Sequence, residues 1–393
     1  MTTGFPINAQ DILPDDASNA VLIGRIWDPR VSGPTPVLLD GETLRDISSV
    51  APTVSEILEL DDVLAKLSNP ASFPTVATLS DILDQSRPGA DENTPHLLSP
   101  NDLQAIKASG VTFVASLLER VIEEQARGDS SKADQIRTEI TGIIGDDLSQ
   151  IEPGSQKAAD IKTVLLEKGA WSQELEVGIG PDAEIFTKAP VMSAVGHGAH
   201  VGLHPISTWN NPEPEVVLTV TSKGKIVGAT LGNDVNLRDV EGRSALLLGK
   251  AKDNNASCAI GPFIRLFDGK FTLETVKSAD IAMAVDGPEG YHLDAVSSMS
   301  QISRTPESLV SQAIGKHHQY PDGIMLFLGT MFAPTDDRGG AGKGFTHEMG
   351  DLVSISTPSL GKLVNQVDRS DAIKPWTFGI SALMNNLARR GLL

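Results

Sequence analysis

The segment NPEPEVVLTVTSKGKIVGATLGNDV, residues 211–235, decides the fold of this chain. Two apolar runs, 216–220 and 226–231, flank the turn-forming pair Lys223-Gly224. Runs of this length on both sides of a short turn predict a β-hairpin. Similar runs, broken by Gly, Asn, Asp and Pro, stand at 184–190, 324–332 and 351–367. From about residue 171 the sequence therefore predicts an antiparallel all-β or mixed core.

Three carboxylates converge at one end of this predicted hairpin. Glu213 and Glu215 are two residues apart at the start of the first strand, so their side chains share one face. Counting outward from a two-residue turn at Lys223-Gly224 places Asp234 opposite Glu213. Three oxygen ligands without His or Cys favour Mg²⁺, with Mn²⁺ as a substitute, over zinc. The alternative is a solvated acidic strand end that binds no metal.

Other polar residues near this hairpin have both a chemical and a structural interpretation. Lys252 follows the hairpin closely and could bind an anionic substrate or act as a base, or it could be a surface lysine. Glu184, Phe186 and Lys188 lie on one face of a predicted strand. There Glu184 could be an acid–base group or an ordinary half-exposed residue. Gly329-Thr330 ends an apolar strand and could offer an N–H and a hydroxyl to a carboxylate, or only turn the chain.

Residue composition and hydrophobic patterning divide the whole chain into three parts. Residues 1–98 predict a small α/β N-terminal domain, with a capping box from Thr53 to Glu56 and a hairpin turn at Asp40-Gly41. Within it, residues 68–97 are rich in Pro, Ser and Asp and are typical of a surface connection. Residues 99–170 predict a helical segment that starts the active site, with helices at 114–128, within 131–144 and within 155–169. Residues 171–393 form the predicted catalytic domain.

Charge and composition exclude several classes of function. The net charge is −19 over 393 residues, which repels nucleic acid and anionic lipid, although it could also serve solubility alone. One cysteine, Cys258, excludes an internal disulfide framework and a thiolate-rich zinc site. No stretch approaches the roughly 20 apolar residues that cross a bilayer, and residues 1–16 lack the features of an export signal. We therefore expect a cytoplasmic protein that binds neither nucleic acid nor membrane.

An ordered set of motifs resembles the fumarylacetoacetate hydrolase superfamily. The motifs are Phe186-x-Lys188, Glu213-x-Glu215, Gly232-Asn233-Asp234-Val235-x-x-Arg238-Asp239, Lys252 followed by Gly261-Pro262, and Gly329-Thr330. The resemblance implies an α+β protein with a mixed β-roll catalytic domain, Mg²⁺ bound by Glu213, Glu215 and Asp234, and Lys252 at the substrate. It also implies a homodimer or a dimer of dimers.

One departure from the family pattern bears on the reaction. Many hydrolase members place a water-activating His in the segment that matches Gly110 to Ser116, and here Ser116 stands at that position. This segment, with Arg120, and the run STWNNPEPE are instead similar to the sugar-acid dehydratase branch. That resemblance makes Glu184 an acid–base group and assigns substrate binding to Ser116, Arg120, Lys188, Arg238, Asp253 and Thr330.

The resemblance implies dehydration of a 2-keto-3-deoxy-D-pentonate to 2,5-dioxopentanoate, in the degradation of pentoses such as D-xylose. Glu184 and Lys252 are the candidates for the base at C3 and for the acid at the C4 hydroxyl, and the sequence leaves open which is which. The positive charge of Mg²⁺ favours a neutral lysine, which makes Lys252 the better base and Glu184 the proton donor. Two alternatives remain open. One is a hydrolase that cleaves a carbon–carbon bond of a 2,4-diketo acid, and the other is a non-catalytic ligand-binding member.

Overall fold

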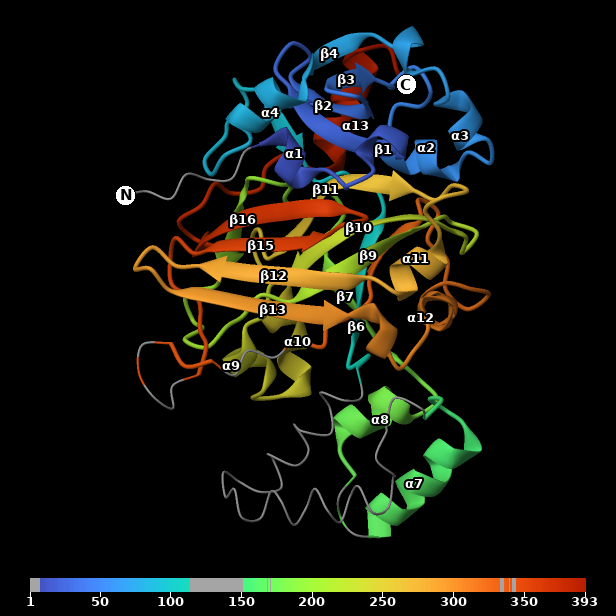
Figure 1. The fold of residues 1–393 in the computed structure, drawn as a ribbon, viewed down its shortest axis with the longest axis vertical. Helices are drawn as coiled ribbons and strands as arrows, with labels where there is room; N and C mark the ends of the chain where they lie inside the picture. Colours follow the sequence, from blue (N-terminus) through green and yellow to red (C-terminus); the bar gives the residue numbers. More distant parts are fainter. Residues whose placement is uncertain are drawn as a thin grey trace.

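The computed structural model describes residues 8–113, 151–167, 169, 171–332, 336–338, 340 and 344–393. In this part of the chain the strands form two sheets (Figure 1). The larger sheet runs β4 (Thr75–Thr78), β3 (Thr43–Asp46), β2 (Gly33–Asp40), β1 (Leu22–Asp28), β11 (Cys258–Leu266), β10 (Ile226–Asp234), β9 (Pro214–Val220), β14 (Ile324–Phe327), β6 (Ala105–Gly110) and β7 (Glu184–Ala189), while β5 (His96–Leu98) also pairs with β1. The smaller sheet runs β13 (His292–Ser298), β12 (Asp280–Asp286), β15 (Leu352–Thr357), β16 (Gly361–Arg369) and β8 (His200–Leu203).

Short helices connect and cover these sheets. The α-helices in the described residues are α1 (Ala9–Ile12), α2 (Val54–Glu59), α3 (Val63–Lys66), α4 (Leu79–Gln85), α7 (Gln156–Glu167), α8 (Gln173–Ile179), α9 (Arg238–Glu241), α10 (Leu248–Lys252), α11 (Leu273–Lys277), α12 (Pro306–Ala313) and α13 (Ile380–Arg389). The 3₁₀ turns are η1 (Ala17–Asn19), η2 (Pro70–Ser72), η4 (Ala245–Leu247) and η5 (Met299–Gln301). Among the described residues, no helix is long and apolar enough to span a membrane.

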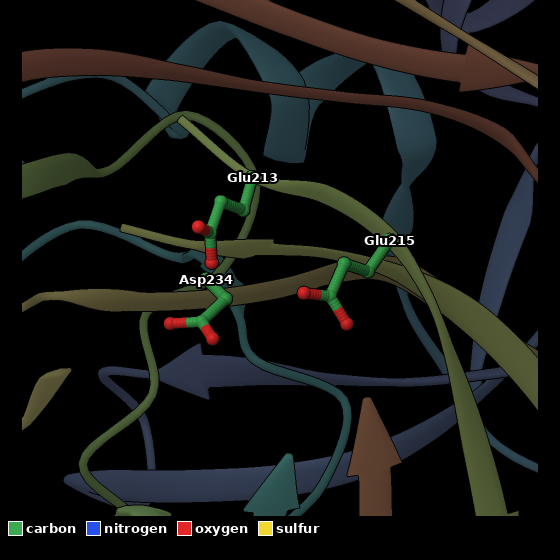
Figure 2. A group of neighbouring side chains, drawn as sticks. All are labelled: Glu213, Glu215 and Asp234. Atoms are coloured by element: carbon green, nitrogen blue, oxygen red, sulfur yellow. The ribbon is translucent and has the colours of Figure 1, made fainter. Parts of the chain in front are cut away.

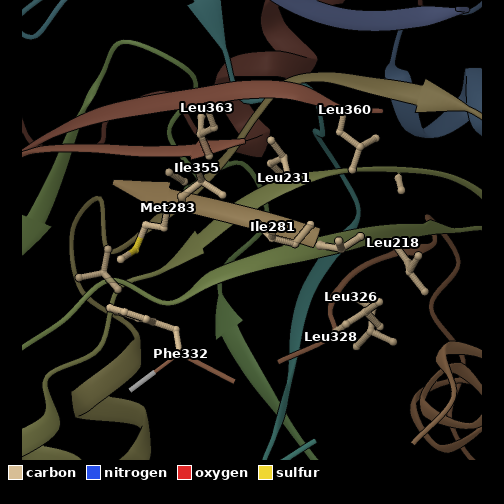
Figure 3. Packing of buried hydrophobic residues seen from close by; sticks show 14 of the residues in the cluster. Leu218, Leu231, Ile281, Met283, Leu326, Leu328, Phe332, Ile355, Leu360 and Leu363 are labelled. Carbon is tan, nitrogen blue, oxygen red and sulfur yellow. The ribbon is translucent and has the colours of Figure 1, made fainter. Parts of the chain in front are cut away.

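The main core lies between the two sheets (Figure 3). Leu218 and Leu231 of the larger sheet pack there with Ile281, Ile355 and Leu363 of the smaller sheet. The opposite face of the larger sheet packs against α2 and α3 in a second apolar cluster. Because β9 is covered on both faces, every one of its residues is buried, and its sequence is nearly continuously apolar. By contrast, β12 alternates exposed and buried residues because only one of its faces is covered. The expectation of a mixed sheet is confirmed, since β14 runs parallel to β6 and β16 runs parallel to β8.

The β9–β10 hairpin has the predicted register but a different turn. Its loop is three residues, 222–224, closed by the hydrogen bond from Thr221 N to Lys225 O, and Gly224 adopts a φ of +78° that favours glycine. This loop alone would shift the pairing by one residue. Val227 is an extra residue in β10, between the pairs Ile226–Val220 and Gly228–Thr219, and it restores the predicted alignment. Gly232 therefore lies opposite Glu215.

The N-terminal strands continue the sheet that carries the hairpin. β1 pairs antiparallel with β11, which in turn pairs with β10. The hairpin predicted at Asp40-Gly41 joins β2 and β3, but its two-residue turn is 41–42, because Asp40 pairs with Thr43. The Thr53 side chain caps α2 by accepting from Glu56 N at 3.2 Å, as predicted. The prediction that residues 68–97 only connect surface elements was wrong. They contain β4 and α4, because Leu79, Ile82 and Leu83 form a buried helical face that the polar composition obscured.

The predicted helical segment, 99–170, contains both a strand and a helix. Its first part forms β6, which pairs with β14 and β7 inside the larger sheet. The helix expected within 155–169 is confirmed as α7, which lies with α8 at the end of the molecule opposite β1–β4 (Figure 1). The two helices predicted between 114 and 144 fall outside the described residues.

Candidate metal and active site

Three carboxylates gather where β9 begins and β10 ends (Figure 2). Each of Glu213, Glu215 and Asp234 offers an oxygen atom, and these atoms all lie within 4.8 Å of one another. The register brings them together, because Asp234 N donates to Glu213 O at 3.0 Å and Glu215 lies two residues along on the same face. Glu215 and Asp234 are almost fully buried.

Neighbouring groups fix the orientation of each carboxylate. Gly329 N donates to Glu215 Oε2 at 2.6 Å, and the Asn236 amide donates to Glu213 Oε1 at 3.1 Å. The predicted N–H donor of Gly329-Thr330 thus contacts a protein carboxylate in this structure. Oδ1 of Asp234 receives no well-directed hydrogen bond among the described residues, although Lys188 Nζ lies 2.8 Å away.

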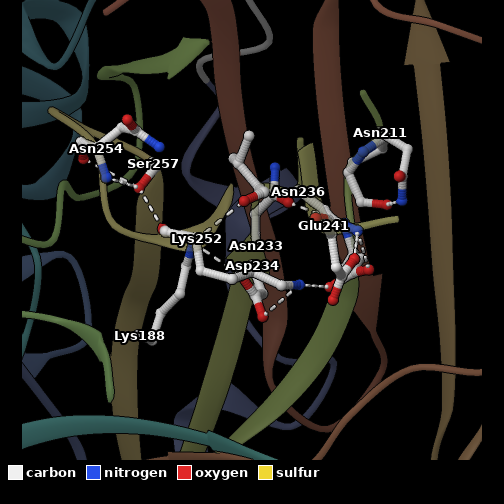
Figure 4. A network of polar contacts seen from close by, with 12 residues as sticks. Lys188, Asn211, Asn233, Asp234, Asn236, Glu241, Lys252, Asn254 and Ser257 are labelled. Atoms are coloured by element: carbon white, nitrogen blue, oxygen red, sulfur yellow. Dashed lines mark hydrogen bonds and ion pairs between the residues drawn. The ribbon is translucent and has the colours of Figure 1, made fainter. Parts of the chain in front are cut away.

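Two lysines contact the carboxylates from different sides (Figure 4). Lys252 is the last residue of α10, and its Nζ lies 2.5 Å from Glu213 Oε2 and 3.2 Å from Asp234 Oδ2. Lys188 is completely buried, and its Nζ also donates to the main-chain oxygens of Val235, at 3.1 Å, and of Lys252. Lys188 therefore holds Asp234 and the chain that follows it, whereas Lys252 lines the cavity that opens beside the carboxylates.

In the absence of a cation, the surroundings of this cluster disfavour the ionised form of all three carboxylates at once. Burial raises the pKa of Glu213 to about 7, and Asp234 adds to the effect, although Lys252 opposes it. Burial, Asp234 and Glu213 together raise the pKa of Glu215 well above its usual range. For Asp234, burial acts upward, but Lys188 and Lys252 outweigh it and lower the pKa. Burial alone would lower the pKa of Lys252, yet Asp234 and Glu213 raise it well above its usual range.

This donor set fits a hard divalent cation. Two carboxylate charges within 4.8 Å repel each other by about 3 kcal/mol or more at an effective dielectric constant of roughly 20. A divalent cation would remove that repulsion, and oxygen ligands are those that Mg²⁺ prefers. Cys258 lies opposite Asp234 in the register, but burial raises the pKa of its thiol to about 12, so it does not offer a thiolate.

A cavity of about 70 Å³ opens beside the carboxylates. We call it the acidic cavity. Its wall is formed by Ser109, Gly110, Val111, Glu174, Glu184, Phe186, Glu213, Glu215, Asp234, Glu241, Lys252, Gly329 and Thr330. The structure thus brings together the three predicted metal ligands, both predicted catalytic residues and one predicted substrate residue, Thr330.

Glu184 lies on this wall at the first position of β7. Burial and the carboxylate of Glu241 raise the pKa of Glu184, while Lys252 opposes them. Its side chain passes over Gly110, where a Cβ atom would lie only 1.9 Å from Glu184 Oε2. The absence of a side chain at Gly110 therefore leaves the space that this carboxyl group occupies. The raised pKa favours the protonated carboxyl, which is the form of Glu184 that can donate a proton.

Other predicted substrate residues do not line the acidic cavity. Lys188 lies behind Asp234, because it is the extra residue of a bulge where Thr187 and Ala189 pair with Lys107 and Ile106. The guanidinium of Arg238 stacks on the Trp209 ring, 4.5 Å from its centroid. Asp253 is exposed and lines a separate hollow with Ser370 and Trp376. Ser116 and Arg120 lie outside the described residues.

The sequence did not identify several residues on the wall. Glu241, at the end of α9, accepts from the Asn236 amide at 2.6 Å, and Glu174 reaches the cavity from α8. α9 begins at Arg238, shortly after β10 ends, and both residues are placed by the packing of short helices, so strand periodicity gave no signal for them. Val111 has a φ of +51°, which is strained for a β-branched residue and is a feature often seen beside active sites.

Comparison with known proteins places this site in a family. The sequence model of the fumarylacetoacetate (FAA) hydrolase C-terminal region matches residues 165–368, which are 204 of the 393 residues. The chain is 31% identical over 186 residues to the 2-dehydro-3-deoxy-D-arabinonate dehydratase of Saccharolobus solfataricus. It is 30% identical over 184 residues to the probable 2-keto-3-deoxyxylonate dehydratase of Haloferax volcanii. These matches cover 47% of this chain and 59% and 60% of the relatives, so the chain spans about three fifths of the curated relatives it matches.

Solved structures share the fold over a longer range. A 2-keto-3-deoxy-D-arabinonate dehydratase complexed with magnesium and 2,5-dioxopentanoate aligns with a TM-score of 0.60 and 20% identity, covering 88% of this chain and 99% of that chain. The fumarylacetoacetate hydrolase of the psychrophile Exiguobacterium antarcticum aligns with a TM-score of 0.52 and 13% identity, covering 89% and 100%. At these identities the likeness concerns the fold alone.

Proposed function

Because this chain belongs to the fumarylacetoacetate hydrolase family, we propose that it is a Mg²⁺-dependent hydro-lyase that converts a 2-keto-3-deoxypentonate to 2,5-dioxopentanoate. One observation carries the proposal: Glu184 and Lys252 face the same small cavity as the Glu213, Glu215 and Asp234 cluster. The two curated relatives, each a dehydratase of this substrate class by name, support the choice of reaction.

We propose that Glu213, Glu215 and Asp234 hold the cation, with Mn²⁺ as a substitute for Mg²⁺. When bound, Mg²⁺ supplies a Lewis acid for the 2-keto carboxylate of the substrate. Lys188 is then a positioning residue, because it is fully buried and holds Asp234 from behind. Thr330 lies on the cavity wall and offers a hydroxyl to the substrate.

Proton transfer falls to Lys252 and Glu184. In the proposed reaction, Lys252 Nζ takes a proton from C3, the C4–O bond breaks, and Glu184 protonates the hydroxyl so that it leaves as water. The resulting C3–C4 double bond becomes the aldehyde by a proton shift from C5 to C3 and ketonisation of the enol. Overall, one water molecule is lost and no electrons are exchanged.

The charge state of Lys252 depends on its neighbours. Asp234 and Glu213 stabilise its ammonium form, which cannot accept a proton. A cation bound to the same carboxylates offsets their negative charge and so favours the neutral amine that the base requires. The proposal therefore makes the base active only in the metal-loaded protein.

A product assay tests the proposal directly. The full chain, with Mg²⁺ and then with excess EDTA, is incubated with both C4 enantiomers of 2-keto-3-deoxypentonate, and the products are followed by NMR. We expect an aldehyde at C5 that forms only with the metal and from one enantiomer in preference. Pyruvate released from a 2,4-diketo acid, without aldehyde from either enantiomer, would assign the protein to carbon–carbon bond hydrolysis. Mg²⁺ binding without turnover of either class would instead indicate a ligand-binding member.

A further inference from the structure

A second cavity, of about 250 Å³, shares no residue with the acidic cavity. We call it the arginine cavity. Its wall comes from β1, β2, β5 and the segments 87–90, 192–200, 255–256 and 373–378. Its volume is several times the roughly 30 Å³ that one water molecule takes in the liquid, so it accommodates an organic molecule.

Arg25 on β1 is the buried charge of this cavity. Arg25 is only 5% exposed, and its Nε donates to Ser99 O at 2.9 Å. Its second donor group, Nη1, is buried without a hydrogen-bond partner among the described residues. Burial lowers the pKa of Arg25, and the Asp102 carboxylate opposes that shift only in part. That carboxylate accepts from Val54 N and Ser55 N at 2.6 and 2.9 Å. A buried guanidinium with an unused donor is costly unless an anion completes it.

The other charged side chains on the wall of the arginine cavity are positively charged. Arg87 and Lys374 also line the arginine cavity, and none of the described lining residues is Asp or Glu. Lys374 is exposed and donates to Ala90 O at 3.2 Å, which holds its side chain across the cavity margin. This charge distribution contrasts with the overall net charge of −19. Arg87 and Lys374 are exposed at the margin, and Arg87 Nη2 lies 3.9 Å from Asp84 Oδ1 outside the wall. The wall itself carries only positive charge, which favours an anionic ligand.

Aromatic rings supply the apolar part of the wall. Trp27 and Phe378 form an edge-to-face pair with centroids 5.2 Å apart, and Trp376 lies beside them in the lining. The indole N–H of Trp27 donates to Glu92 O at 2.8 Å, and that of Trp376 donates to Phe378 O at 3.0 Å. Because both indole donors already have protein acceptors, the rings offer apolar surface to a ligand.

We propose that the arginine cavity is a second binding site, for a small organic molecule that joins a carboxylate or phosphate ester to a planar apolar body. The oxyanion would pair with Arg25 and Lys374, and the planar body would lie against Trp27, Trp376 and Phe378. Arg recognises both oxyanions through its planar fork of donors. This site is independent of the proposed dehydratase reaction.

Ligand-observed NMR titration of the full chain tests the ligand class. The probes are benzoate, its neutral isostere benzamide, phenyl phosphate, and acetate, which has no planar body. We expect saturable binding of benzoate, and binding of benzamide and acetate at least about tenfold weaker. Tighter binding of phenyl phosphate than of benzoate would identify a phosphate ester, and the reverse a carboxylate; both support the proposal. Equal affinity for benzoate and benzamide would overturn it.

Three variants test the location. Lys374→Ala and Trp376→Ala change exposed side chains, so both should fold, and each should weaken benzoate binding several-fold. Arg25→Gln should weaken it by about tenfold or more. Lys316→Ala, an exposed lysine outside both cavities, is the matched control and should bind as the wild type does. Wild-type affinity in both Lys374→Ala and Trp376→Ala, or displacement of benzoate by pyruvate with Mg²⁺, would refute this location.

Discussion

The ammonium nitrogen of Lys252 lies 2.5 Å from Oε2 of Glu213, so the proposed base is an ion-pair partner of a proposed metal ligand. Because the Lys252 ammonium group and a bound cation would contact the same carboxylate, each affects the charge state or binding of the other. The role of Lys252 and that of the metal can nevertheless be separated experimentally, because removal of the lysine leaves all three carboxylates in place.

Lys252→Met should lower kcat by about 10²- to 10⁴-fold, the range typical of a lost general base. Mg²⁺ affinity should not weaken, because the variant removes a positive charge beside the carboxylates. Steady-state rates and calorimetric Mg²⁺ titration measure the two effects, and Lys250→Met on the same helix is the matched control. Near-normal turnover in Lys252→Met would exclude the proposed base.

Glu215→Gln should change stability in opposite directions with and without Mg²⁺. In metal-free protein the variant should be at least as stable as the wild type, because it removes a buried carboxylate and keeps an acceptor for Gly329 N–H. Mg²⁺ at 100 times its Kd should stabilise the wild type by about 2.7 kcal/mol and the variant by much less. Urea unfolding measures both, with the exposed Glu274→Gln as control. Equal stabilisation of Glu215→Gln and wild type by Mg²⁺ would remove Glu215 from the ligand set.

Gly110→Ala should reduce turnover by displacing Glu184. The new Cβ would lie 1.9 Å from Glu184 Oε2, so the carboxyl group must move out of its place. We expect at least a tenfold fall in kcat with a smaller effect on Mg²⁺ affinity, because the three carboxylates come from the β9–β10 hairpin and not from β6. Gly269→Ala, where the new atom meets nothing within 4 Å, is the control and should be fully active. Full activity of Gly110→Ala would argue against a role for Glu184 at its observed position.

His197 should make the fold sensitive to acid. Burial lowers its pKa to about 4, whereas an unfolded chain protonates histidine near about 6.5. Between these values the unfolded state binds more protons, so stability falls as the pH falls from about 6.5 to about 4. In His197→Asn, the amide oxygen can accept from Val364 N in place of the imidazole nitrogen. Between about pH 6.5 and about pH 4, the free energy of unfolding of this variant should fall by on the order of 3 kcal/mol less than that of the wild type. Urea unfolding from pH 7 to pH 4.5 would show parallel curves if His197 did not contribute.

The sequence predicted the convergence of Glu213 and Asp234 through two compensating differences. The turn is one residue longer than expected, and the extra residue Val227 in β10 cancels the shift. Alternation along a strand follows from backbone geometry and is therefore readable in a sequence. Bulges depend on what packs around the strand, and for that reason neither Val227 nor the bulge at Lys188 was foreseen.

The wall of the acidic cavity was less predictable than its metal-binding edge. Glu241 and Glu174 reach it from the short helices α9 and α8, whose packing strand periodicity does not describe. The strand at β6 was missed because Ala105–Gly110 contains one β-branched residue, Ile106, and is held as a strand by its pairing with β14 and β7. Propensity and periodicity describe single elements, whereas these features arise from the assembly of several.

The pairing of β1 with β11 has a practical consequence for protein engineering. Removal of the first hundred residues would strip β11 of a neighbour and leave unpaired main-chain donors and acceptors one strand away from Asp234. Such an edge is a template for strand addition from another molecule, so the shortened protein would self-associate. The N-terminal hundred residues therefore cannot be exchanged as a detachable module, and chimeras between relatives should be joined elsewhere than at this border.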